Sequence, residues 1–142
     1  MSKIRLEIVT PDKGEVFSQD IDMLIVRTIA GELGILPKHA RLLTELIPYP
    51  IKIKVDGSEH VIAVSGGFIE VTPDLITVLA DAAELPEDID VDRAKAAHAR
   101  AVERIKMFKE SVKAEYEIDI KRANAALARA KARLLIKNIS VD

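Results

Sequence analysis

Residues Pro86–Ala97, which read P-E-D-I-D-V-D-R-A-K-A-A, mark the point at which this chain changes character. The residues before this stretch are rich in β-branched side chains and turn residues, as is typical of strands. The residues after it combine alanine with charged side chains at helical spacing. We therefore expect a β-domain over residues 1–86 and an α-helical domain over residues 87–142.

The β-domain is predicted from short strand-like segments. Residues 4–8 and 51–55 alternate apolar and polar side chains, and Asp56-Gly57 is a strong hairpin signal. Turn residues follow such segments at intervals of roughly 8–12 residues, and they include Pro11–Gly14, the expected loop Gly31–Pro37, Gly66-Gly67 and Pro73-Asp74. This spacing predicts an antiparallel β-sandwich or barrel rather than strands alternating with helices, and we expect the sandwich.

The helical domain is predicted from two series of apolar side chains that recur every three or four residues. The first is Ala94, Ala97, Ala101, Ile105, Phe108 and Val112, and the second is Tyr116, Ile120, Ala123, Leu127, Ala130 and Leu134. A break between two helices is expected near Lys109–Glu115. The stripes predict an antiparallel two-helix hairpin. The contact between its helices should be weak, because alanine side chains bury little apolar area and each Å² contributes only about 25 cal/mol.

Charge is divided unevenly along the chain. Residues 1–89 carry 8 Lys and Arg against 15 Asp and Glu, whereas residues 90–142 carry 13 against 8. The two halves should attract each other, or the basic half should meet an acidic partner. The chain has no Trp, 3 Phe and 2 Tyr, so no aromatic platform accompanies the basic residues and nucleic-acid binding is not expected.

Several classes of function are not expected. The chain lacks cysteine, and His39, His60 and His98 are not spaced as metal ligands. No apolar run approaches the roughly 18 residues of a membrane span, so direct membrane insertion is not predicted. No nucleophile elbow, phosphate-binding loop or dinucleotide fingerprint is present. The sequence therefore predicts neither a metal site nor an enzyme.

Asp90 and Arg93, followed at once by Ala94, admit two interpretations. In the first, Asp90 is an N-cap that accepts hydrogen bonds from first-turn amides, and Arg93 is solvated. In the second, Asp90 accepts from a ligand amine or hydroxyl, Arg93 binds a phosphate, and the short Ala94 allows close approach to the helix N-terminus. The spacing alone leaves both open.

The second predicted helix carries an unusual basic face. Arg122, Arg129 and Arg133 are seven and four residues apart, and no acidic residue occurs from Lys121 to Val141. A solvated helix face normally mixes both signs of charge at spacings of three or four. This face is therefore expected to meet phosphates or carboxylates from elsewhere.

Three blocks carry a resemblance to a known family: G-E-L-G-I-L-P-K-H-A at 31–40, V-S-G-G-F-I-E-V at 64–71, and L-A-D-A-A-E-x-x-x-x-I-D-x-x-R-A at 79–94. Together they resemble the epsilon subunit of the bacterial F-type ATP synthase, in its bacillus-like, ATP-binding branch. The resemblance covers the whole chain in the same order. Arg41 departs from it, since relatives commonly have proline there, and this affects only the local loop.

The resemblance implies a non-catalytic rotor subunit, peripheral on the cytoplasmic face of the cell membrane. The sandwich would bind the gamma subunit and the c-ring, with the loop around Gly31–His39 facing the ring. The helical hairpin would be a switch. Docked on the sandwich it permits turnover, and extended along gamma into the alpha/beta hexamer it blocks ATP hydrolysis.

The resemblance also implies a regulatory ATP site, made of Glu84, Ile89, Asp90, Arg93, Ala94, Arg129 and Arg133. A magnesium ion is compatible with this site and is not predicted. We expect plentiful ATP to hold the hairpin closed.

The alternative is a stand-alone adaptor whose basic hairpin binds an acidic protein without nucleotide. Co-purification with gamma would distinguish the two functions. A small nucleotide hydrolase is a more distant alternative that requires turnover by the isolated chain.

Overall fold

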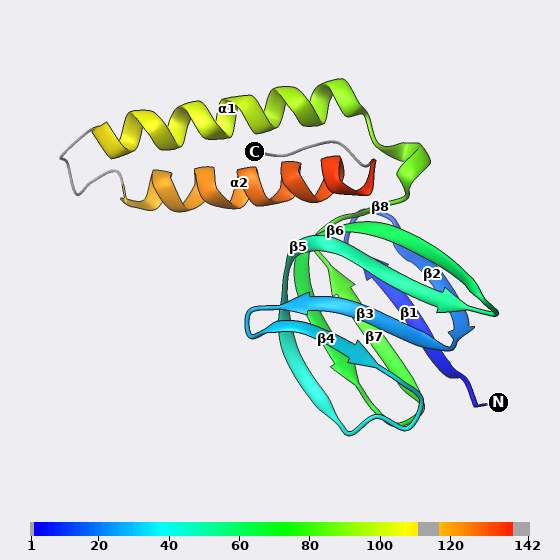
Figure 1. Ribbon diagram of the computed structural model, residues 1–142. Helices are drawn as coiled ribbons and strands as arrows, with labels where there is room; N and C mark the ends of the chain where they lie inside the picture. Colours follow the sequence, from blue (N-terminus) through cyan, green and yellow to red (C-terminus); the bar gives the residue numbers. More distant parts are fainter. Residues whose placement is uncertain (1, 111–116, 138–142) are drawn as a thin grey trace.

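A computed structural model describes residues 2–110 and 117–137 of the chain. It consists of a sandwich of strands with a helical hairpin lying across one end of it (Figure 1). The strands are β1 (Ile4–Thr10), β2 (Gly14–Ile21), β3 (Met23–Thr28), β4 (Gly31–Ile35), β5 (Leu42–Val55), β6 (Ser58–Val71), β7 (Leu75–Ala80) and β8 (Ala83–Glu84). A 3-10 helix η1 (Pro86–Asp88) leads into α1 (Val91–Glu110) and α2 (Glu117–Ile136).

The strands form one sheet that folds over itself. Their order is β2-β1-β7-β6-β5-β3-β4, with β8 paired to β6. The pairing is antiparallel except between β1 and β7, which run parallel. Strand β2 also contacts β5 from the opposite layer, so the sheet closes into the predicted sandwich. The fold class predicted from the sequence, a β-sandwich followed by two helices, is confirmed.

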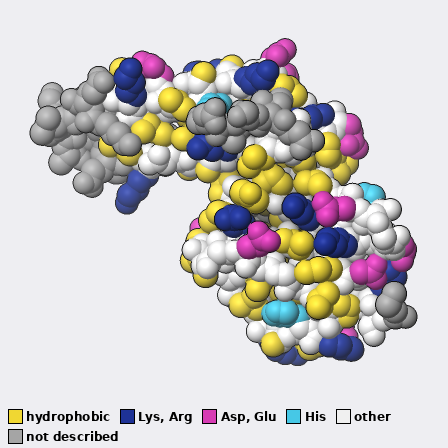
Figure 2. Space-filling view, in the orientation of Figure 1, with side chains coloured by type: hydrophobic (Ala, Val, Ile, Leu, Met, Phe, Trp, Pro, Cys, Tyr) yellow, Lys and Arg dark blue, Asp and Glu magenta, His cyan; other side chains and the backbone are white. Residues whose placement is uncertain are grey.

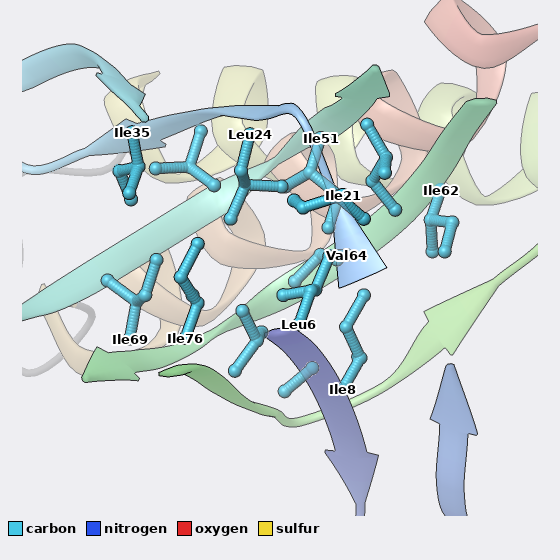
Figure 3. Close-up of a cluster of buried hydrophobic side chains, with 14 of the residues drawn as sticks. Leu6, Ile8, Ile21, Leu24, Ile35, Ile51, Ile62, Val64, Ile69 and Ile76 are labelled. Atoms are coloured by element: carbon cyan, nitrogen blue, oxygen red, sulfur yellow. The ribbon is translucent and has the colours of Figure 1, made fainter. Parts of the chain in front are cut away.

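The core lies between the two layers of the sandwich. Along β1, Ile4, Leu6 and Ile8 are buried while the residues between them are not. Leu24 from β3 and Ile76 from β7 converge on the same cluster, which is made almost entirely of aliphatic side chains (Figure 3). Alternating burial of this kind fixes the register, because a slip of one residue would turn the apolar set outward.

Two turn predictions were wrong. Gly66-Gly67 does not end a strand, because β6 runs unbroken from Ser58 to Val71. Both glycines have positive φ, at 95° and 130°, a conformation that bends the strand while its pairing continues on both sides. The expected loop Gly31–Pro37 contains β4 over Gly31–Ile35, which pairs with β3 and buries Ile35 in the core.

The helical hairpin packs as the periodicity predicts. Ala94 and Ala101 of α1 are buried, as are Ala123 and Ala130 of α2. Helix α2 contacts α1 and also β5 and β6, so it lies between α1 and the sandwich (Figure 1). The structure describes neither the side chain of Phe108 nor residues 111–116, so the packing expected for Phe108, Val112 and Tyr116 and most of the expected break lie outside the described part.

Candidate functional site

A cavity of about 520 Å³ lies where the helical hairpin meets the sandwich. Its volume falls in the range of about 300–1,000 Å³ that is usual for small-molecule sites. The chain supplies its walls from the β1–β2 turn, the β8 region, η1, the N-terminal half of α1 and the C-terminal half of α2. Figure 2 shows hydrophobic side chains at this junction with charged side chains of both signs beside them.

Asp90 caps the N-terminus of α1 and lines the cavity on that side. Its Oδ1 accepts a hydrogen bond of 3.0 Å from the backbone N–H of Arg93, so Asp90 is the N-cap of α1. The same residue, Arg93 and Ala94 all line the cavity. The two interpretations of this stretch are thus compatible: the capped helix start is also a wall of the site.

Four arginines line the cavity, two from each helix. Arg93 and Arg100 are seven residues apart on α1, and Arg129 and Arg133 are four apart on α2, so each pair shares one helix face. Arg122, which the sequence places on the same stripe, is exposed and is not among the lining residues. The closed hairpin therefore directs arginines of both helices into one space.

Glu84 of β8 forms an ion pair with Arg133 across this space. Arg133 Nε donates to Glu84 Oε1 at 2.5 Å, and the two side chains are 27% and 22% exposed. Arg133 of the predicted basic face of α2 thus meets a carboxylate of the sandwich. The remaining four N–H groups of the guanidinium are not used in this contact.

The charges in the cavity are segregated by origin. Its acidic lining residues come from the β1–β2 turn, β8, η1 and the N-cap of α1, and they are Asp12, Glu84, Asp88 and Asp90. All four of the arginines come from the helices. A hydrogen bond from the Thr10 hydroxyl lowers the pKa of Asp12 below its ordinary value, because this bond favours the charged carboxylate. The cavity therefore holds four arginines of the helices, Lys13 of the β1–β2 turn and four carboxylates that can accept hydrogen bonds.

Six of the seven predicted site residues line this cavity, namely Glu84, Asp90, Arg93, Ala94, Arg129 and Arg133. The seventh, Ile89, is 7% exposed and is buried just before α1, outside the lining set. Sequence reasoning missed Lys13, Asp12, Asp88 and Arg100. Spacing could have found Arg100, which is two helical turns after Arg93, but nothing local connects the β1–β2 turn to a helix some 80 residues later.

Two kinds of feature were not found in the described part of the chain. Residues 2–110 and 117–137 contain no group of three or more His, Cys, Asp and Glu that could hold a metal ion. None of the helices, over the residues that are described, is both long and apolar enough to cross a membrane.

Comparison with known families covers almost all of the chain. The model of the ATP synthase delta/epsilon chain β-sandwich domain matches residues 3–86, and that of the delta/epsilon long α-helix domain matches residues 87–137. The chain belongs to the ATP synthase delta/epsilon family. The relatives described next identify it as an epsilon chain, which is a non-catalytic subunit of the ATP synthase.

Individual epsilon chains agree with this assignment. The chain is 54% identical over 110 residues to the ATP synthase epsilon chain of Alkalihalophilus pseudofirmus, covering 78% of this chain and 82% of the relative. It is 49% identical over 105 residues to the epsilon chain of Bacillus subtilis, covering 74% and 79%.

Solved structures share the fold at low sequence identity. A chain of the Euglena gracilis mitochondrial ATP synthase OSCP/F1/c-ring assembly matches with a TM-score of 0.78 at 21% identity, covering 97% of this chain and 82% of that one. A chain of the Tetrahymena thermophila central stalk and c-ring matches at 0.57 and 19% identity, covering 93% and 97%. The sandwich and hairpin described above therefore occur together in ATP synthase assemblies.

Proposed function

We propose that this epsilon-family chain is the ATP-sensing regulator of a proton-translocating ATP synthase. In this proposal its sandwich couples gamma to the c-ring, and its helical hairpin inhibits ATP hydrolysis when it leaves the sandwich. ATP in the cavity keeps the hairpin docked. The observation that carries the proposal is the cavity itself, in which arginines of both helices face carboxylates held by the sandwich, the linker and the helix start.

The arginines and carboxylates that line the cavity favour a nucleoside triphosphate as the ligand. ATP carries about four negative charges on one end, and guanidinium groups bind phosphate oxygens with paired, charge-assisted hydrogen bonds. Its base and sugar carry an amine and hydroxyls that can donate to carboxylates such as Glu84 and Asp90. The short Ala94, which lines the cavity, leaves room beside them for a flat ring.

A ligand of this kind would change the balance between docked and undocked hairpins. Without it, arginines 93, 100, 129 and 133 repel one another, and the helix seam consists mainly of alanine, which buries little apolar area. A ligand that binds only the docked form stabilises it by about 2.7 kcal/mol at a hundredfold excess over Kd. That free energy is comparable to the net stability of a weakly packed hairpin, so ATP depletion would release it.

The released hairpin would carry its basic side chains to another partner. Residues 90–142 hold 13 Lys and Arg against 8 Asp and Glu, which suits acidic segments of the alpha and beta subunits. We propose that the helices extend along gamma into the hexamer and obstruct hydrolysis there. The subunit itself would stay on the cytoplasmic face of the membrane as a peripheral part of the complex.

Two exposed apolar regions of the sandwich suit the other partners. Phe68 and Leu79 are directly paired across β6 and β7, are 53% and 55% exposed, and lie near the exposed Leu43 of β5. We assign this face to gamma. Ile29 and Leu36, at the two ends of β4, are also exposed, and we assign them to the c-ring. Phe68 and Leu79 share one face, as expected of an interaction surface, whereas Ile29 and Leu36 would make separate contacts at opposite ends of β4.

Calorimetric titration of the purified chain with ATP tests the site. Arg93→Ala and Arg129→Ala should each weaken binding by about tenfold or more, since a hydrogen bond to a charged group contributes about 1.5–3 kcal/mol. Arg122→Ala is the matched control, because it removes the same charge from an exposed position outside the cavity. Asp90→Asn keeps the helix cap while it removes the carboxylate.

The hairpin response is measured separately, by hydrogen exchange of the α2 amides with and without ATP. At an ATP concentration a hundredfold above the wild-type Kd, exchange along α2 should slow in the wild type and in Arg122→Ala, and should slow clearly less in Arg93→Ala. Equal affinities of Arg93→Ala, Arg129→Ala and Arg122→Ala would rule out the site. Tight binding without any change in α2 exchange would rule out its role in holding the hairpin.

A further inference from the structure

We infer that Lys13 binds the phosphates of the ligand and fastens it to the sandwich. This inference rests on the proposed function, and it names a residue outside the predicted site. Lys13 belongs to the turn between β1 and β2, about 70 residues before the linker, yet its side chain lines the cavity together with the four arginines. Its role would be to make the bound ligand a bridge between the two domains.

The position of Lys13 is held at both ends of the residue. Its backbone N–H donates to the Thr10 hydroxyl at 3.2 Å, which fixes the turn. Its Nζ donates to the Ala83 carbonyl of β8 at 3.3 Å, next to Glu84. An ammonium group has three N–H donors, and this contact occupies one of them. Two donors therefore remain for a ligand in the cavity.

Lys13 matters because the other charged groups on the sandwich side of the cavity are acidic. The sandwich and linker place Asp12, Glu84 and Asp88 at the cavity, and these carboxylates repel a polyphosphate. Of the described lining residues, Lys13 is the one cation that the sandwich contributes. A ligand held by arginines alone would bind only the hairpin. Contact with Lys13 would connect it to the body on which the hairpin docks.

A ligand in the cavity could have two separate effects: it could hold α1 against α2, and it could hold the closed hairpin on the sandwich. Arginines 93, 100, 129 and 133 can draw α1 and α2 together without involving the sandwich. The ligand can stabilise the docked state of the closed hairpin only by contacting groups on the sandwich side. Loss of Lys13 should therefore reduce both the affinity for ATP and the protection that ATP gives to α2.

Lys13→Met tests the inference, because methionine preserves the unbranched apolar stem and removes the charge. Lys54→Met is the matched control, since Lys54 is an exposed sandwich lysine that does not line the cavity. We expect ATP to bind Lys13→Met about 5- to 30-fold more weakly than the wild type, and Lys54→Met to bind normally. Lys13→Arg should retain most of the affinity. Inorganic tripolyphosphate should show the same order of affinities, because the proposed contact is with phosphate.

Hydrogen exchange of α2 supplies the second measurement. ATP at a saturating concentration for each variant should protect α2 less in Lys13→Met than in Lys54→Met. If the wild type binds ATP and Lys13→Met binds it equally well, the inference about Lys13 is wrong while the proposed site stands. If the wild type binds neither ATP nor tripolyphosphate, the site and the role of Lys13 are both overturned.

Discussion

Arg133 of α2 donates through Nε to Glu84 of β8 at 2.5 Å, which joins two residues 49 positions apart in the chain. Both side chains are largely removed from solvent, and the pair connects the second helix directly to the sandwich. Glu84 and Arg133 also line the proposed ATP site, so the same two residues serve both the docking contact and the site.

We expect this ion pair to stabilise the docked hairpin by about 1–2 kcal/mol, between the values for exposed pairs and for hydrogen bonds to charged groups. Glu84→Ala should therefore speed exchange of the α2 amides by about 5- to 30-fold without ATP. Glu87→Ala, at an exposed position in η1, is the control. A double-mutant cycle with Arg133→Ala isolates the pair, and additive effects of the two substitutions would show that the contact contributes nothing.

Much of this fold could be predicted from local patterns. The change of period at Pro86–Ala97 predicted the division into strands and helices, and alternation identified the buried face of β1. The errors came from glycine. Gly66-Gly67 looks like a strand end because the sequence cannot reveal that positive φ angles bend one continuous strand.

The site was predictable only in part, for a different physical reason. Residues close in sequence, such as Asp90, Arg93 and Ala94, could be grouped from helix geometry, and the resemblance supplied Glu84, Arg129 and Arg133. Lys13 reaches the cavity only because β1 and β2 lie in the same layer as the strands leading to β8. Contacts of that kind depend on the tertiary fold and leave no local signal.

Gly67 occupies a place where no other residue should fit. Its φ is 130°, and a Cβ there would lie 2.1 Å from the Leu79 carbonyl oxygen and 2.9 Å from Ala80 Cα. Gly67→Ala should destabilise the sandwich by about 3 kcal/mol or more, combining backbone strain of about 1–3 kcal/mol with similar overpacking. Gly57 has a φ of 80°, and an added Cβ there would meet no atom within 4 Å. Gly57→Ala should therefore lower the free energy of unfolding by only about 1–2 kcal/mol. Urea denaturation measures both, and equal losses would refute the steric argument.

Asp22 should make the stability of the sandwich depend on pH in acid. The hydrogen bond from Lys3 Nζ, at 2.9 Å, is the main cause that lowers the pKa of Asp22, and the backbone N–H of Asp56 adds to it. A carboxyl whose folded pKa is lowered contributes stability above its unfolded pKa of about 3.9, and this is lost as pH falls through the folded value. Asp22→Asn should flatten the decline in stability between about pH 5 and pH 2.

The same contact can be checked by carboxyl NMR titration. Lys3→Met should raise the pKa of Asp22 toward its ordinary value, because the hydrogen bond from Lys3 is the main cause of the shift. An Asp22 that titrates identically in the wild type and in Lys3→Met would contradict the assignment.

Ala130 tests whether the helical hairpin can be opened without harm to the sandwich. It is completely buried in α2, whereas Ala125 on the same helix is exposed. Leucine at position 130 has no space between the closely packed elements and should cost about 1–3 kcal/mol, whereas Ala125→Leu should have little effect. Because the sandwich has its own aliphatic core, Ala130→Leu should speed exchange of α1 and α2 amides while amides of β5 and β6 remain protected. If the strands lose protection together with the helices, the two domains unfold as one unit, and a ligand-controlled hairpin on a stable sandwich becomes untenable.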